Sequence, residues 1–344
     1  MKFRIIGDAP AAALLTGLLA AEKQEVIWNP DIEGDERLKK LKQRREIRLI
    51  LPGGWVRSEN FGLSASARLK AGETGVVAIG DPGRLARADS ASAGRIGSAG
   101  RTLLLLDCRE EERKRIVNPG ATVIRGLSLL EATEWDTGVV EVPAPRPRLM
   151  VETGPELQEL KNCLKACLST PLQTPRRVRL KQREPGIEEV EDLPACRNAL
   201  DLWKLLSLPL ALCHSTLGVF LSYEEGRQIA LRVLQEGFSL LSHLEMPVAR
   251  LPVMDPQELL QRLQRRPGEF DAGRNKPDRR FGTALGCLLR GQEKAARAPN
   301  DRIVRLSSQT GIDPTWNWAL TQKVSRVRRT GFFRDPIELY NAIS

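Results

Sequence analysis

Three small residues, Gly7, Ala9 and Ala12, lie in the first predicted turn of the chain, directly after the apolar run Phe3–Ile6. In a dinucleotide-binding turn, small residues at this spacing let the chain bend, let the backbone approach a pyrophosphate, and let the next helix pack closely on the strand. The spacing therefore predicts that backbone amides at the start of a helix bind a dinucleotide.

Other residues of the same turn weaken this site. Ala9 adds a methyl group where the phosphates should come closest, Pro10 removes one amide donor, and Asp8 adds a negative charge. A Rossmann domain that keeps its packing but has lost its cofactor therefore stays open as the alternative.

Asp31 follows the second β-rich run, Glu25–Trp28. An acidic side chain at this place normally accepts hydrogen bonds from the adenosine ribose and repels a 2′-phosphate. If a cofactor binds, NAD is favoured over NADP; otherwise Asp31 is a solvated loop carboxylate.

Six cysteines and two histidines offer little further chemistry. No CxxC pair is present, and the histidines are too few for a mixed zinc site of the common spacing. Cys163 and Cys167 share one helix face, where core packing is favoured over a metal or redox pair. Cys108 ends a strand and could face a ligand crevice, with Arg109 to lower its pKa, but packing is again favoured.

In the first half of the chain, short β-rich runs alternate with helical or loop segments. This pattern is typical of a parallel sheet with crossover helices, which would position these residues. Most of the β-rich runs are continuously apolar, as strands covered on both faces should be. The runs are Phe3–Ile6, Glu25–Trp28, Arg48–Leu51, Val76–Ile79, Thr102–Leu106, Thr122–Arg125 and Val139–Val142.

A proline-spaced stretch at Pro143, Pro145 and Pro147 predicts the exit from this first domain. We therefore expect a Rossmann-type doubly wound parallel sheet over residues 1–150 and a mainly helical domain over 151–344. The helices are expected at Pro155–Leu168, Leu193–Leu221, Tyr223–Leu244, Pro256–Arg265, Arg279–Ala298, Asp301–Thr310 and Pro314–Arg329, with one strand-like run at Arg176–Gln182. Asp255 and Asp313, each before a proline, are expected helix N-caps.

Composition narrows the class of protein. No secretory signal is evident at the start, and Leu202–Leu221, broken by Lys204 and Pro209, is better explained as a buried helical segment than as a membrane span. We expect a cytoplasmic protein without a membrane partner.

The net charge of +10 suits a polyanionic partner or a phosphate-rich cofactor. The basic clusters are scattered, and aromatic residues at 5% leave few platforms for stacking bases. Nucleic acid is therefore the less favoured partner. The clusters are Lys39–Arg45, Arg176–Arg179, Arg279–Arg280 and Arg326–Arg329.

In this order of domains the chain resembles the ketopantoate reductase family, in which a Rossmann domain precedes a helical substrate domain and the active site lies between them. One anchor is Leu202–Leu206, similar to the family's tryptophan-lysine-leucine segment. The other is Leu288–Gly291, followed by Asn300 and then by Gly311–Pro314. The resemblance implies a small-molecule ligand in an interdomain cleft, and a homodimer stays open.

The resemblance makes Lys204 the general acid to the keto oxygen, because a cation stabilises the developing alkoxide and can hand over a proton. The alternative is a snorkelling lysine on an apolar helix. The family's two asparagines, four and eight residues after the lysine, are Leu208 and Leu212 here. Its substrate-binding glutamate falls at Ala295, and Glu293 points to nearly the opposite helix face.

Thr283 falls where the family has a serine hydroxyl for the substrate carboxylate, although a helix-surface threonine fits the sequence as well. On the cofactor side, the family's lysine becomes Gly80-Asp81, its His-Asn-Gly becomes Asp107-Cys108-Arg109, and Asp31 stands in place of its arginine for the NADPH phosphate.

The resemblance therefore predicts a divergent member without pantoate-forming activity, kept as a ligand-binding or interaction module or for another redox reaction. An active NAD(P)-dependent 2-oxoacid reductase using Lys204 is the first alternative, and a basic nucleic-acid-associated protein is the second.

Overall fold

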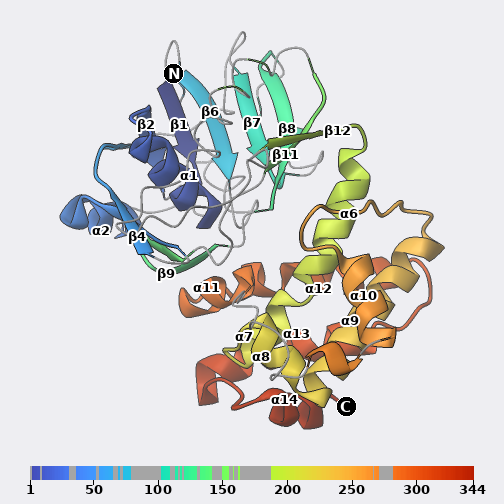
Figure 1. Ribbon diagram of the computed structural model, residues 1–344. Helices are drawn as coiled ribbons and strands as arrows, with labels where there is room; N and C mark the ends of the chain where they lie inside the picture. Colours follow the sequence, from blue (N-terminus) through green and yellow to red (C-terminus); the bar gives the residue numbers. More distant parts are fainter. Residues whose placement is uncertain are drawn as a thin grey trace. The chain divides into compact units, whose positions relative to one another are not determined.

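The computed structural model of the chain is shown in Figure 1. The chain forms two compact units, Met1–Leu193 and Pro194–Ser344. The division falls later than the boundary predicted near residue 150, because β11 (Leu149–Glu152) and β12 (Ile187–Val190) belong to the sheet of the first unit. The structure describes residues 2–7, 10–30, 36–51, 54–64, 69, 73–78, 102–108, 113–114, 117, 120–129, 132–141, 149–154, 158, 162, 187–265, 267–270 and 282–344.

The main sheet of the first unit has eight strands in the order β12-β11-β8-β7-β6-β1-β2-β5. All neighbouring pairs are parallel except β8 with β11. This arrangement confirms the expected Rossmann-type α/β class. The remaining strands of this sheet are β1 (Lys2–Ile6), β2 (Glu25–Asn29), β5 (Gly62–Leu63), β6 (Glu73–Ala78), β7 (Thr102–Leu106) and β8 (Thr122–Ser128).

Helix α1 (Pro10–Ala21) is buried along its whole length up to Ala20, because it is apolar on every side. One side packs on β1 and β2, and the other contacts a second, four-stranded sheet of order β4-β3-β10-β9. Gly17 marks the close approach, since a Cβ there would lie 3.1 Å from side-chain atoms of Ile47 and Leu49. The hydroxyl of Ser58 donates to the Gly17 carbonyl at 2.8 Å.

The second sheet corrects one expectation. The runs Arg48–Leu51 and Val139–Val142 form strands, but as β3 (Ile47–Leu51) and β10 (Val139–Glu141) they lie in the small sheet and not in the parallel one. The outer face of α1 needs an apolar cover, and a continuous apolar run does not say which sheet it joins. The other strands of this sheet are β4 (Gly54–Ser58) and β9 (Thr133–Asp136), and α2 (Glu36–Arg44) precedes β3.

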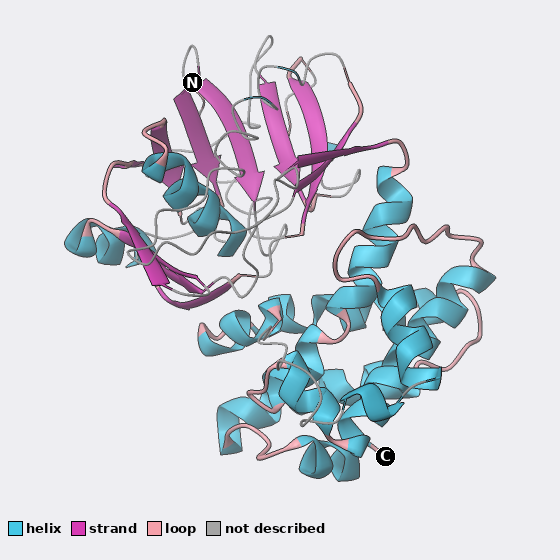
Figure 2. Cartoon of the chain, viewed as in Figure 1, coloured by secondary structure: helices cyan, strands magenta, loops and turns pink. Residues whose placement is uncertain are grey.

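The described residues of the second unit are helical apart from turns and loops, among them the loop at residues 244–255, as Figure 2 shows. The segment Leu193–Leu221 forms three helices instead of one, and the backbone turns at Leu205–Leu206 and again before Thr216. The helices are α6 (Leu193–Lys204), α7 (Ser207–Leu212), α8 (Leu217–Ser222), α9 (Glu224–His243), α10 (Pro256–Arg265), α11 (Thr283–Leu289), α12 (Glu293–Ser307), α13 (Thr315–Thr330) and α14 (Pro336–Ile343), with one 3₁₀ turn at Pro267–Phe270.

The two expected helix caps have different outcomes. The carboxylate of Asp255 accepts the Gln257 N–H at 2.9 Å, which confirms it as a cap of α10. Helix α13 has no side-chain cap of its own, and the carboxylate of Glu236 from α9 accepts the N–H groups of Trp316 at 2.8 Å and Asn317 at 3.0 Å.

Some predicted segments fall outside the described residues: the strand Arg176–Gln182 entirely, and the helix Pro155–Leu168 except for residues 158 and 162. Among the helices that the structure describes, none has both the length and the apolar composition needed to cross a bilayer.

Candidate functional site

The strand order reverses at β1, which makes this strand the switch point of the main sheet. The chain passes from β1 to β2 and β5 on one side, and then from β6 to β7 and β8 on the other. In open α/β sheets the ligand crevice lies outside the carboxyl ends of the strands at such a point. The residues that follow β1, β2 and β7 are therefore the first candidates for a ligand site.

Gly7 directly follows β1 and has φ at 135°, a conformation that favours glycine. Its N–H donates to the carbonyl of Asn29 at 3.0 Å, and its own carbonyl accepts the indole N–H of Trp28 at 3.1 Å. The end of β2 thus holds the glycine turn from both sides. Ala9 lies outside the described residues.

Ala12, the third small residue of the fingerprint, lies near the start of α1. It is fully buried in the first turns of α1, and its carbonyl accepts the hydroxyl of Thr16 at 2.8 Å. Asp31, the predicted ribose ligand, lies outside the described residues, so its role stays a prediction.

Asn29 is a candidate site residue that the sequence does not predict. It is the last residue of β2 and is 1% exposed, yet both polar atoms of its carboxamide lack a hydrogen-bond partner among the described residues. A buried amide without partners costs free energy. An orphaned donor and acceptor beside the glycine turn fit a polar group such as a nucleotide at this edge of the sheet.

The end of β7 is held by local structure. Asp107 has φ at 57°, and its carboxylate accepts the Ser128 N–H at 3.1 Å, which ties the end of β7 to β8. Cys108 is half-buried and packs on a small apolar cluster with Ile6 and Leu103. Packing explains this cysteine without a nucleophilic role.

In the second unit, the segments that carry Lys204 and Thr283 adjoin. Lys204 is the last residue of α6, and Thr283 is the first of α11; both are half-buried. Gly282 has φ at 75°, and a Cβ on it would lie 2.9 Å from the Cα of Ser207, three residues after the lysine. The starts of α7 and α11 are therefore in direct contact.

The positions of the family's two asparagines are filled by core residues. Leu208 and Leu212 are both 0% exposed, on α7. Ala295 is half-buried near the start of α12, and Glu293 is the first residue of that helix.

Asn300 has a structural task that its sequence position did not reveal. Pro209 has no N–H to donate to the Leu205 carbonyl four residues earlier, and the side-chain amide of Asn300 donates to that carbonyl at 3.3 Å. The same amide donates to the Asn317 side chain at 2.8 Å, whose own amide donates to Glu236 at 2.8 Å. Burial raises the pKa of Glu236, and the N–H groups of Trp316 and Asn317 partly offset this effect. The network joins three helices, α9, α12 and α13, to the turn between α6 and α7.

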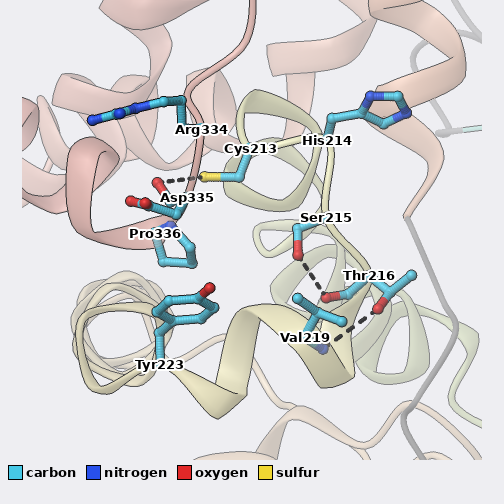
Figure 3. A pocket seen from close by; sticks show the side chains of 9 residues that line it. All are labelled: Cys213, His214, Ser215, Thr216, Val219, Tyr223, Arg334, Asp335 and Pro336. Atoms are coloured by element: carbon cyan, nitrogen blue, oxygen red, sulfur yellow. Dashed lines mark hydrogen bonds between the residues drawn. The ribbon is translucent and has the colours of Figure 1, made fainter.

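A cavity of about 270 Å³ lies where α8 meets the start of α14 (Figure 3). Three of its polar side chains have local partners: Thr216 caps α8, Asp335 caps α14, and the Cys213 thiol donates to the Asp335 carbonyl at 3.6 Å. Burial raises the pKa of Cys213 to about 12, so this thiol is not a nucleophile near neutral pH.

The described residues contain no group of three or more histidine, cysteine, aspartate or glutamate side chains that could hold a metal ion. Cys163 and Cys167 lie outside them.

Comparisons with known proteins identify the fold. No protein-family model matches the sequence. The search of curated proteins also gives no match. Solved structures do match: a ketopantoate reductase of the PanE/ApbA family from Ralstonia eutropha has a TM-score of 0.66 at 16% identity, over 96% of this chain and 99% of that one.

Two more structures show the same relation. D-mandelate dehydrogenase with NADH and anilino(oxo)acetate has a TM-score of 0.67 at 12% identity, over 96% of this chain and 99% of that one. The 2-dehydropantoate 2-reductase from Methylococcus capsulatus has a TM-score of 0.60 at 15% identity, over 96% and 98%. The resemblance stated from the sequence is thus confirmed at the level of structure: this chain has the fold of the ketopantoate reductases, as a divergent example of it.

Proposed function

We propose that this chain is a ligand-binding relative of the ketopantoate reductases that does not form pantoate. The observation that carries the proposal is the burial of Leu208 and Leu212 in the core of the second unit. These are the places where the resemblance puts two asparagines that support the lysine.

Leucine can neither hold a lysine by hydrogen bonds nor bind a substrate hydroxyl. Loss of one preorganised donor to a developing oxyanion typically costs about 3 kcal/mol in the barrier. Ala295 removes a further polar group where the resemblance places the substrate-binding glutamate. Several such losses together lower the rate of ketopantoate reduction by many orders of magnitude.

The ligand that we propose is a nicotinamide dinucleotide, with NAD favoured over NADP because of Asp31. The parallel sheet, the glycine turn held by Trp28 and the unpartnered amide of Asn29 support this ligand. Such a cofactor supplies or accepts hydride when it is bound. The residues of the chain that would hold it are Gly7, Ala12 and Asn29.

The test is a calorimetric titration with NADH and NADPH, followed by an assay for ketopantoate-dependent oxidation. We expect binding without oxidation above the rate of the Lys204→Ala variant. Oxidation that this substitution abolishes would refute the proposed loss of activity.

A second function is an active reductase of another 2-oxoacid that uses Lys204. The contact between Gly282 and Ser207 favours it, because that contact brings the segment of Thr283 to the segment of Lys204. A panel of aromatic and aliphatic 2-oxoacids tests this function. Turnover that is lost in Lys204→Ala and partly kept in Lys204→Arg would support it, and no turnover with any acid in the panel would remove it.

We also propose a cytoplasmic location. None of the four cysteines that the structure describes, Cys108, Cys196, Cys213 and Cys287, forms a disulfide, as is usual in a reducing compartment.

A further inference from the structure

We propose that Asn29 is a ligand-binding residue, whose carboxamide pairs with a sugar hydroxyl of the bound dinucleotide. The inference rests on the proposed function and adds to it the residue that recognises the sugar. It starts from the placement of one side chain at the carboxyl end of β2.

Asparagine is unusual at this place. It is depleted in strands, and a buried polar side chain is normally hydrogen-bonded. Asn29 is 1% exposed, and among the described residues it is the one asparagine whose side-chain donor and acceptor are both buried and unpartnered. Folding therefore buries an amide that the described protein groups do not satisfy.

The face of the sheet that Asn29 occupies follows from the alternation of β2. Val26 and Trp28 pack in the core around α1, so Ile27 and Asn29 lie on the opposite face. In the parallel register Asn29 is the partner of Ile6, which belongs to the apolar cluster on that face. The amide thus lies between the glycine turn and apolar side chains, which offer it no hydrogen bond.

The chemistry of the carboxamide selects the ligand group. The side chain offers two N–H donors and one carbonyl acceptor and carries no charge. A hydroxyl can accept from the amide and donate to its carbonyl at once, whereas a phosphate only accepts. A sugar hydroxyl next to a turn that suits a pyrophosphate satisfies both requirements.

The experiment compares Asn29→Leu with the matched substitution Asn198→Leu. Asn198 is also buried, but its amide donates to the Pro247 carbonyl at 2.8 Å and its carbonyl accepts from Arg302 at 3.1 Å. NADH and ADP-ribose are titrated by calorimetry, and the melting temperature is measured with and without NADH.

We expect Asn29→Leu to raise the melting temperature of the ligand-free protein by about 2–4 °C, because it removes an unsatisfied buried amide. The same variant should bind both nucleotides about tenfold more weakly. Asn198→Leu should lower the melting temperature and leave nucleotide affinity unchanged. These opposite signs separate a ligand-binding asparagine from a structural one.

Three results would overturn the inference. An unchanged affinity in Asn29→Leu would mean that the amide does not touch the ligand. A lower melting temperature in that variant would mean that Asn29 has a structural partner, for example a bound water. If the unaltered protein binds neither nucleotide, the inference fails, while the proposed absence of pantoate formation would still stand on the oxidation assay.

Discussion

The indole of Trp28 connects the end of β2 to the glycine turn. It is fully buried, lies 6.5 Å from the ring of Phe61, and donates its N–H to the Gly7 carbonyl. A hydrogen bond between neighbouring strand ends fixes the course of the chain where the expected dinucleotide site begins. The turn therefore depends on a residue outside the glycine fingerprint.

Trp28→Phe should keep most of the packing and lose this hydrogen bond. Because the Gly7 carbonyl is then left without the indole donor, we expect a loss of about 1–2 kcal/mol in the free energy of unfolding. Urea denaturation measures it, with Trp55→Phe as the control, since Trp55 is 53% exposed on β4. Equal midpoints for the two variants would show that the hydrogen bond adds nothing.

The thiol of Cys213 gives a prediction about reactivity and pH. Its pKa is raised from 9.0 to about 12 by burial, and the negative charges of Asp335 and Glu338 act in the same direction. A raised pKa contributes stability that is complete below pH 9.0 and is lost as the pH rises toward 12.

Because its pKa is raised, this thiol is almost entirely neutral in the folded state at pH 8. We expect iodoacetamide to label Cys213 only after unfolding, read by mass spectrometry of the peptides, and to label the half-buried Cys108 earlier. Rapid labelling of Cys213 in the folded protein would contradict the buried, neutral thiol.

At the residue scale, the sequence predicts part of the candidate site. Gly7 and Ala12 follow from spacing, because a turn and a close helix contact need small residues wherever they occur. Asn29 does not follow, since its lack of a partner depends on which residues surround it after folding. The role of Asn300 is equally tertiary, because the carbonyl that it satisfies lies 95 residues earlier in the chain.

Among the elements, the break between α6 and α7 shows how a hydrogen bond that a proline removes is replaced by a residue far away in the sequence. Pro209 takes away the donor that would continue the helix past Leu205, and Asn300 supplies another. We therefore expect Pro209 and Asn300 to be energetically coupled, and a double-mutant cycle measures this coupling.

Asn300→Ala should cost about 2–3 kcal/mol of unfolding free energy, because it leaves the Leu205 carbonyl without this donor inside the core. In a Pro209→Ala background the new backbone N–H can bond that carbonyl, so the cost should fall by about 1 kcal/mol. Pro256→Ala, at the start of α10, is the control and should show no coupling with Asn300→Ala. Strict additivity with Pro209→Ala would refute the repair.

The sequence predicts which segments form strands better than it predicts which sheet each strand joins. The apolar runs identify seven strands, but β3 and β10 joined the small sheet because the all-apolar α1 needs a cover on its outer face. The short strands β11 and β12 carried no clear alternation and were not among the predicted strands, although the compact first unit extends through them to Leu193. The expected helix at Arg279–Ala298 is divided at Gly291, where φ is 72°.

For the whole molecule, the net charge of +10 raises the question of whether the protein binds a polyanion such as nucleic acid. Many of the described arginines are paired with carboxylates in their own unit and so neutralise charge locally. Such pairs join Arg44 to Asp136, Arg48 and Arg57 to Glu46, Arg125 to Glu152, Arg302 to Asp201, and Arg326 to Glu338. The predicted basic clusters are therefore partly compensated at Lys39–Arg45 and Arg326–Arg329.

The net charge of +10 already counts these carboxylates, so the ion pairs do not lower it; they lower only the charge of each basic cluster. A cluster that neutralises fewer phosphates binds nucleic acid with a less steep dependence on salt. We expect the protein to leave a heparin column early, and to show no retention of a labelled duplex or single strand at about 150 mM salt. At low salt, weak retention should be the same for unrelated sequences. Binding of one sequence or one strand type that persists at about 150 mM salt would instead favour a nucleic-acid-associated protein, because scattered charge gives neither persistence nor preference.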